Sequence, residues 1–311
     1  MTNGTILTYQ VYVAPVIAMA GKDVPPGQSR STWSPISATL ICGRHDAVLV
    51  DPLMTVEQGM AVADWVSTTG KNLTTVYVTH GHGDHWFGLG AVRERFPGVR
   101  AVATPAVIEG MRKWSAPEVL QTFWQPRFPG QIPDDNPVAD PLDGPFFELE
   151  GRQLVAVDVG HTDTDDTTVL HVPDIGLVVA GDAVYNGVHQ YLAESGSQGR
   201  QDWLAALDII EALDPRAVVA GHKRYGNDDN PRIIGEPAST SATSIGSTRK
   251  PPRPRNSTGR CSRFTRTEST PAHCGSRPSR QRPEPVRDKR ARHVRSGRSS
   301  HRSSSMRQIT G

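Results

Sequence analysis

The 311-residue sequence is poor in cysteine and has no long hydrophobic segment. Its three cysteines, Cys42, Cys261 and Cys274, are too few for a disulfide scaffold or for a zinc site made of cysteine alone. No apolar run approaches the ~20 residues that cross a bilayer, so we expect no membrane partner. Because few cysteines are typical of a reducing compartment, the expected location is the cytoplasm.

Acidic and basic residues are distributed unevenly along the chain. Residues 1–235 carry 16 Lys and Arg against 28 Asp and Glu, a net charge of −12. Residues 236–311 carry 18 basic against 4 acidic residues, a net charge of +14. This shift indicates a domain over residues 1–235 followed by a basic tail. The negative charge of the domain disfavours nucleic acid as its partner.

The tail at residues 236–311 is rich in Arg, Ser and Pro and lacks a periodic apolar pattern, which predicts disorder. Two interpretations are open. The tail could be a nucleic-acid-binding arm, although Phe264 is its only aromatic residue. Alternatively it is a frameshift product, since removing two bases from permitted codons for residues 236–247 gives a peptide with helical apolar spacing. The nucleotide sequence of the gene distinguishes the two.

Strand and helix patterns alternate in residues 1–235, which predicts an α/β layered domain. The expected helices span residues 56–68, 86–96 and 203–213. The expected strands span residues 36–42, 47–50, 75–79, 99–104, 154–159, 167–172, 176–180 and 217–220. Residues 105–148 are less regular and hold several aromatic side chains and prolines. This segment is a packed insertion, a lid or substrate wall, or both; its aromatic residues include Trp114, Phe123, Trp124 and Phe128.

Three histidines and an aspartate, His80, His82, Asp84 and His85, directly follow the expected strand at residues 75–79. Imidazole and carboxylate groups are ligands for zinc and other first-row metals. Three further candidates, His161, Asp182 and His222, each follow an apolar strand and a glycine. Because sites in α/β proteins gather at strand ends, this repeated pattern predicts that the side chains converge on a metal site.

The order of these motifs resembles that of the metallo-β-lactamase-fold hydrolases. His-x-His-x-Asp-His at residues 80–85 is followed by Gly-His, Gly-Asp and Gly-His at residues 160–161, 181–182 and 221–222. The resemblance covers roughly residues 6–235. It implies a four-layer αββα sandwich with metal ions at one edge.

The resemblance also implies a set of metal ligands for two zinc ions, with iron or manganese as open alternatives. His80, His82 and His161 would hold one ion, Asp84, His85 and His222 the other, and Asp182 would bridge them. Asp51, which closes an early strand, would hydrogen-bond the histidine loop rather than bind metal.

The activity implied is hydrolysis of an ester, lactone or thioester carbonyl in a small molecule by a metal-bridging hydroxide, with Asp84 and Asp182 as catalytic residues. β-Lactamases of the family usually carry cysteine where this chain has Asp182, so the chain resembles the glyoxalase II and lactonase branches. The three residues that we expect to bind substrate follow Asp182: Tyr185, Asn186 and His189.

Other activities are compatible with the same ligand set. Phosphodiester hydrolysis and iron-dependent oxygen or persulfide chemistry are alternatives on the same fold. Non-enzymatic nucleic-acid binding through the tail is a third. The natural substrate and the oligomeric state are left open by the sequence.

Overall fold

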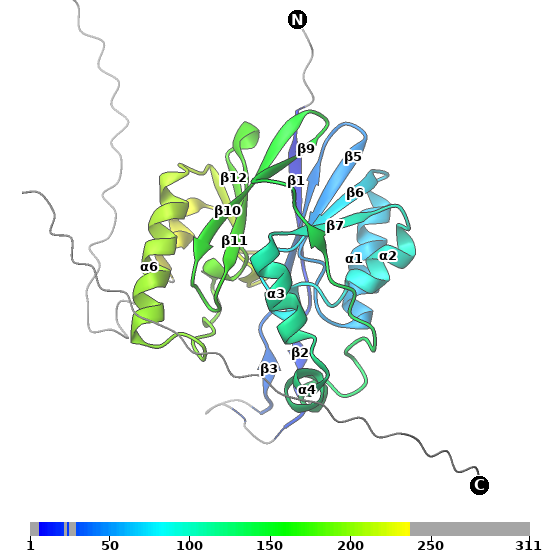
Figure 1. The fold of residues 1–311 in the computed structure, drawn as a ribbon, viewed down its shortest axis with the longest axis vertical. Coiled ribbons are helices and arrows are strands. Elements are labelled where there is room, and N and C mark those ends of the chain that lie inside the picture. Colours follow the sequence, from blue (N-terminus) through cyan, green and yellow to red (C-terminus); the bar gives the residue numbers. More distant parts are fainter. Residues whose placement is uncertain (1–5, 22–23, 25–28, 237–311) are drawn as a thin grey trace, which may run out of the picture. The chain divides into compact units, whose positions relative to one another are not determined.

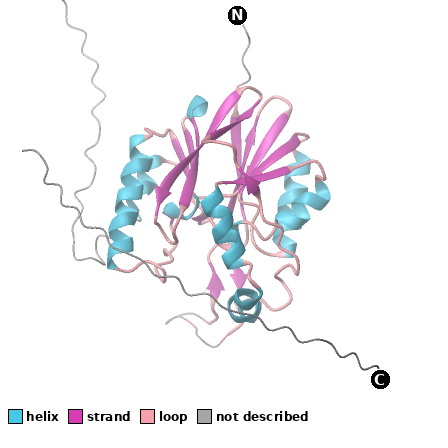
Figure 2. Ribbon diagram, in the orientation of Figure 1, coloured by secondary structure: helices cyan, strands magenta, loops and turns pink. Residues whose placement is uncertain are grey.

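The computed structural model describes residues 6–21, 24 and 29–236. Within them, two β-sheets face each other and helices cover the outer face of each sheet, which gives the four-layer αββα order (Figures 1 and 2). Residues 237–311 of the basic tail lie outside the described residues, so the structure tests neither interpretation of the tail. No helix in the described part is long and apolar enough to cross a membrane.

The first sheet has, among the described residues, six strands in the order β1-β4-β5-β6-β7-β8. The pairs β1–β4 and β4–β5 are antiparallel, whereas β5–β6, β6–β7 and β7–β8 are parallel. The strands are β1 (Thr8–Val13), β4 (Ser37–Cys42), β5 (Asp46–Val50), β6 (Asn72–Tyr77), β7 (Arg100–Ala103) and β8 (Asp140–Pro141).

The second sheet has the order β14-β12-β11-β10-β9, and its only parallel pair among the described strands is β12–β14. Its strands are β9 (Phe146–Leu149), β10 (Arg152–Gly160), β11 (Thr167–Val172), β12 (Leu177–Val179) and β14 (Ala217–Val219). Two short ribbons complete the strands: β2 (Ile17–Ala18) with β3 (Thr32–Trp33), and β13 (Tyr185–Asn186) with β15 (His222–Lys223).

The helices lie on opposite outer faces, with α1 and α2 beside the first sheet and α6 beside the second (Figure 1). The α-helices are α1 (Val56–Thr68), α2 (Leu89–Arg95), α3 (Pro105–Trp114), α4 (Pro117–Val119), α5 (Gln125–Arg127) and α6 (Ser197–Ala212). A π-helix, η2 (Leu120–Trp124), links α4 to α5. The 3₁₀ turns are η1 (Gly83–His85), η3 (Pro173–Ile175), η4 (Gly181–Ala183) and η5 (Pro231–Ile234).

Side chains that alternate along the strands divide the core into layers. In β5, Leu49 packs toward α1 and α2, whereas Val48 and Val50 pack between the sheets. In β12, Val178 packs toward α6, whereas Leu177 packs between the sheets. Because both faces of each sheet are covered, most central strand positions are apolar, which explains why the sequence pattern there was strong.

Helix α1 begins and ends where the sequence predicts, because Thr55 and Gln58 form a capping box at its start. Helix α2 begins three residues later than expected, because residues 86–88 form turns that follow η1. Helix α6 begins six residues earlier than expected. The irregular segment at residues 105–148 contains α3, α4, η2, α5 and β8.

A close backbone contact fixes the loop that carries the predicted metal ligands. Gly88, directly before α2, donates its N–H to Leu53 O at 2.9 Å and lies against Gly59 of α1. This contact holds the 80–88 segment against the loop after β5, where Asp51 lies.

Replacing Gly88 by alanine is expected to destabilise the domain, because the added Cβ would overlap the Pro52 carbonyl oxygen and lie 3.0 Å from Gly59 Cα. Overpacking of this kind costs about 1–3 kcal/mol of unfolding free energy, which urea denaturation would measure. The matched control is Gly90→Ala in α2, whose Cβ would have no neighbour closer than 4.0 Å. Equal stabilities of the two variants would contradict the contact.

Candidate metal centre

The loop after β6 carries four of the predicted ligands and is anchored by Asp51. Asp51 accepts hydrogen bonds from Thr79 N at 3.0 Å and from Thr79 Oγ1 at 2.8 Å. Its Oδ2 also lies 3.3 Å from His85 Nδ1. The backbone of Asp51 is left-handed, with φ of 57°. Such a conformation is costly for a residue other than glycine, and it turns the carboxylate toward the loop. The structure thus places Asp51 behind His85, as expected.

The parallel pair β12–β14 delivers two further predicted ligands to the same edge. Asp182 lies in η4 after β12, and His222 begins β15 after β14. Gly221 N donates to Gly181 O at 2.7 Å. A Cβ at Gly221 would lie 2.6 Å from the Gly181 carbonyl carbon, so only glycine fits this crossing.

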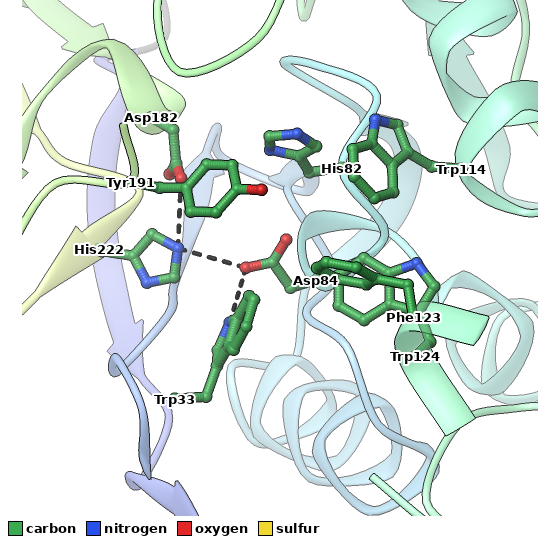
Figure 3. Close-up of a pocket in the computed structure, with 9 residues that line it drawn as sticks. All are labelled: Trp33, His82, Asp84, Trp114, Phe123, Trp124, Asp182, Tyr191 and His222. Atoms are coloured by element: carbon green, nitrogen blue, oxygen red, sulfur yellow. Dashed lines mark hydrogen bonds and ion pairs between the residues drawn. The ribbon is translucent and has the colours of Figure 1, made fainter. Parts of the chain in front are cut away.

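All the predicted ligands except His161 meet in a buried cluster. His85 Nε2 lies 3.1 Å from Asp182 Oδ1, and His222 Nε2 lies 3.2 Å from both Asp182 Oδ2 and Asp84 Oδ2. The rings of His80 and His85 have centroids 4.4 Å apart, and the ring centroid of His82 lies 5.1 Å from that of His80. Figure 3 shows Asp84, Asp182 and His222 side by side, with His82 across the pocket.

The structure differs from the expected ligand set at His161. His161 Nδ1 lies 2.6 Å from Asp165 Oδ1, and its Nε2 lies 3.0 Å from Ser195 Oγ, outside the cluster. Asp163 is fully buried in its place, with Oδ2 2.7 Å from His82 Nδ1 and 3.8 Å from His80 Nε2. A tight turn explains the difference. The Thr162 N–H donates to Thr164 O, so the chain turns at Asp163 and directs its side chain into the cluster, whereas His161 precedes the turn and lies outside the cluster.

Glu194 reaches the same histidine from the segment before α6. Its Oε1 lies 2.8 Å from His82 Nε2, and its Oε2 accepts a hydrogen bond from Thr164 Oγ1 at 3.0 Å. Both ring nitrogens of His82 therefore lie beside carboxylates, one from Asp163 and one from Glu194.

Burial and charge together set the protonation of the cluster. Burial alone would lower the pKa of His82, but the Asp163 and Glu194 carboxylates raise it to about 10. Asp182 and Asp84 likewise outweigh burial at His222, whose pKa is about 9. The pKa of His80 is lowered, chiefly by burial and then by His85. A metal ion would have to displace the protons on His82 and His222.

The chemistry of the cluster fits metal ions. The described residues offer three groups whose ligand atoms lie within 4.8 Å of one another: Asp51, His80 and His85; His80, His82 and Asp163; Asp84, His85 and His222. Five buried atoms of the cluster lack a partner in hydrogen-bond geometry: His80 Nε2, His85 Nε2, His222 Nδ1, Asp163 Oδ2 and Asp182 Oδ1. Four of them have ion-pair contacts only, His85 Nε2 with Asp182 Oδ1, and Asp163 Oδ2 with His82 Nδ1 and, at 3.8 Å, with His80 Nε2. Buried polar atoms without such partners are uncommon, and a bound cation would satisfy them.

A small pocket with a free volume of about 30 Å³ opens onto the cluster. His82, Asp84, Asp182 and His222 form one side, and the remaining lining residues are Trp33, Trp114, Phe123, Trp124 and Tyr191 (Figure 3). Three of these aromatic residues come from the segment at 105–148, so it forms a wall of the pocket. Phe128 is fully buried, 5.5 Å from the Trp33 ring.

The residues expected to bind substrate do not line this pocket. Tyr185 is buried, donates its hydroxyl to Asp182 Oδ2 at 2.7 Å and stacks on the His222 ring. Asn186 is buried and donates to Asp228 O, whereas His189 is exposed. Tyr185 therefore positions two of the candidate ligands.

Sequence reasoning missed four residues of the site: Asp163, Glu194, Trp33 and Tyr191. Asp163 lies two residues after His161, the residue that the sequence indicates as a ligand. Both are potential ligands, and the turn in their loop was not predicted. Trp33 donates its Nε1–H to Asp84 Oδ2 at 2.9 Å across 51 residues. No local pattern marks such a long-range contact.

Comparisons with known proteins agree with this fold. Among curated proteins, none matches the chain. Among solved structures, the chain is similar to a metallo-beta-lactamase from Pontibacter korlensis, with 17% identity, a TM-score of 0.53 and coverage of 76% of this chain and 98% of that one. It is similar to the mono-zinc form of a metallo-beta-lactamase from Pseudomonas aeruginosa, with 17% identity, a TM-score of 0.54 and coverage of 78% and 96%.

A metallo-beta-lactamase family protein from Thermus thermophilus has 22% identity to the chain, a TM-score of 0.50 and coverage of 75% of this chain and 79% of that one. Identities this low show the fold alone. The family model described as the metallo-beta-lactamase superfamily matches residues 31–222, a span that runs from the strand of Trp33 to His222. The chain therefore belongs to the metallo-beta-lactamase superfamily.

Proposed function

We propose that this protein is a metal-dependent hydrolase that uses two zinc ions to cleave an ester, lactone or thioester bond in a small molecule in the cytoplasm. The observation that carries the proposal is the buried convergence of histidine and aspartate side chains at one sheet edge, where ring nitrogens such as His80 Nε2 and His222 Nδ1 have no hydrogen-bond partner. Such a set is costly to bury without a cation, so it supports a metal site rather than a structural polar cluster.

The geometry supports a ligand assignment that differs from the family pattern at one position. His80, His82 and Asp163 would hold one ion, and Asp84, His85 and His222 the other. Asp182 would contact both, since it lies beside His85 and His222 and its charge also acts on His80. Imidazole and carboxylate ligands suit zinc, and a related solved structure is described as a mono-zinc form.

Bound zinc would supply an acidified water and would polarise the substrate carbonyl. The protein itself supplies a proton acceptor and its support. Asp84 uses Oδ2 for its contacts with Trp33 and His222, and Figure 3 shows its other oxygen pointing toward His82 and the Tyr191 hydroxyl. That oxygen is the acceptor offered to the proton of an attacking water. Tyr185 holds Asp182, and Asp51 holds His85.

Asp182 supports the choice of bond. β-Lactamases of the family usually carry cysteine at this position, and an aspartate resembles the glyoxalase II and lactonase branches. Phosphodiester hydrolysis and iron-dependent oxygen or persulfide chemistry use the same fold, and metal content together with a substrate panel distinguishes them.

We expect purified protein to contain about two zinc ions per chain, as measured by elemental mass spectrometry. Asp163→Ala should reduce this to about one ion, because it removes a ligand, whereas His161→Ala should keep about two. Loss of metal from His161→Ala with retention by Asp163→Ala would overturn the assignment of Asp163. A content dominated by iron would favour oxygen or persulfide chemistry.

Asp84→Asn in the zinc-loaded protein should lower kcat on the best ester, lactone or thioester of the panel by about 10²–10⁴-fold, because the amide does not accept the proton. Asp64→Asn is the control, since Asp64 lies on α1 with a side chain that is 76% exposed. Chelation should abolish turnover and added zinc should restore it. Absence of turnover on every member of the panel by fully loaded protein would contradict the proposed reaction.

A further inference from the structure

The pocket wall opposite the cluster is made of aromatic side chains from separate segments. Trp33 belongs to β3, Trp114 ends α3, Phe123 and Trp124 lie in the π-helix η2, and Tyr191 lies in the loop before α6. Trp33, Trp114, Phe123 and Tyr191 are half-buried, so part of each remains open to the pocket. π-Helical turns often occur at functional sites, and this one delivers two of the rings.

These rings support one another in fixed arrangements. The ring centroids of Phe123 and Trp124 lie 4.9 Å apart, those of Trp114 and Phe123 5.3 Å apart, and those of Trp33 and Trp124 5.8 Å apart. Each pair is tilted or edge-to-face, which is a favourable geometry for aromatic pairs. The wall is therefore formed before a ligand arrives.

The aromatic wall is continuous with the candidate ligands. The His82 ring lies 4.7 Å from the Trp114 ring and 5.7 Å from the Tyr191 ring, both edge-to-face. Trp33 contacts Asp84 directly through its Nε1–H. A molecule whose reacting bond lies at Asp84 must therefore place a neighbouring group against the rings (Figure 3).

No lysine or arginine lines the pocket among the residues that the structure describes. The nearby cations are held by the rings: the Arg127 guanidinium stacks on Phe123 at 4.0 Å, and Lys113 lies 6.0 Å from the Trp114 centroid. An anionic flanking group would therefore find no cationic side chain there. The zinc ions of the proposed function would be its only cationic partners, and the Asp84, Asp163 and Asp182 carboxylates would offset three of their four charges. A cationic group gains little from those carboxylates, because the zinc ions would neutralise them.

The size of the pocket limits its occupant. Its free volume of about 30 Å³ is far below the range of about 300–1,000 Å³ for small-molecule sites, so only a small group fits between the rings and the candidate ligands. We propose that the group flanking the scissile bond of the substrate is small, flat and uncharged, such as an aryl ring or a short unsaturated acyl group, and bears no carboxylate or phosphate. The nature of the scissile bond rests on the proposed function, whereas the chemistry of the flanking group rests on the aromatic wall.

Binding of three amides that share one skeleton tests the pocket without requiring turnover. Acetanilide is neutral, 4-acetamidobenzoate is an anion, and (4-acetamidophenyl)trimethylammonium is a cation. Each is titrated into zinc-loaded protein, and binding is followed by quenching of tryptophan fluorescence. We expect acetanilide to bind at least about tenfold more tightly than either charged analogue. Equal or tighter binding of a charged analogue would overturn the inference.

Variants of the aromatic wall test whether it causes the binding of acetanilide. Phe123→Ala should weaken acetanilide binding by about tenfold, and Phe123→Leu, which keeps an apolar side chain but removes the ring, should weaken it as well. Phe146→Ala is the matched control, because Phe146 lies on β9, is 40% exposed and does not line the pocket. Unchanged acetanilide binding in a folded Phe123→Leu protein would overturn the role of the ring.

The corresponding esters separate this inference from the proposed function. Phenyl acetate should have a kcat/KM at least about tenfold above that of 4-acetoxybenzoate. If neither ester is cleaved but acetanilide binds through Phe123, the pocket chemistry holds and ester hydrolysis fails. If the anionic ester is preferred, ester hydrolysis holds and the inference is overturned.

Discussion

The burial of many ionisable groups at one sheet edge is the constraint on which the rest of the structure depends. Charged groups this deep must be paired with one another or with metal, because an unpaired buried charge is costly. Each histidine of the cluster accordingly lies beside an aspartate. Three hydrogen bonds in turn fix the carboxylates: Thr79 donates to Asp51, Tyr185 to Asp182 and Trp33 to Asp84. The supporting residues lie at strand ends of the first sheet and in the two short ribbons, β2–β3 and β13–β15.

The parts of the fold that are set by local patterns were predictable from the sequence. Helix α1 matches its predicted span because a capping box and regular apolar spacing mark it, and strands such as β12 are covered on both faces and have continuous apolar sequences. Asp182 and His222 converge because parallel strands end at the same edge. The sequence did not predict the turn at Thr162–Thr164, which places Asp163 rather than His161 in the buried cluster. That His161 binds metal stays a prediction.

Tyr185 shows a second reason for such differences. Because Tyr185 closely follows Asp182 in the sequence, we expected it to contact substrate. Its hydroxyl does lie near the cluster, 2.7 Å from Asp182 Oδ2. Side-chain direction decides its role, because the hydroxyl turns back to Asp182 while the ring lies flat on His222. The pocket is instead walled by residues from β3, η2 and the loop before α6, whose association depends on tertiary contacts such as that between Trp33 and Trp124, 91 residues apart.

The placement of the aromatic wall also bears on how this protein could evolve. Phe123 and Trp124 lie on a connecting segment rather than on the strands that carry His80, Asp182 and His222. Insertions or substitutions in that segment could therefore change which molecules the pocket accepts while the geometry of the candidate metal ligands is unaltered. Trp33 is the exception, because one face of its indole forms the wall while its N–H holds Asp84. We therefore expect substitutions that change specificity to occur often at the other wall residues but rarely at Trp33.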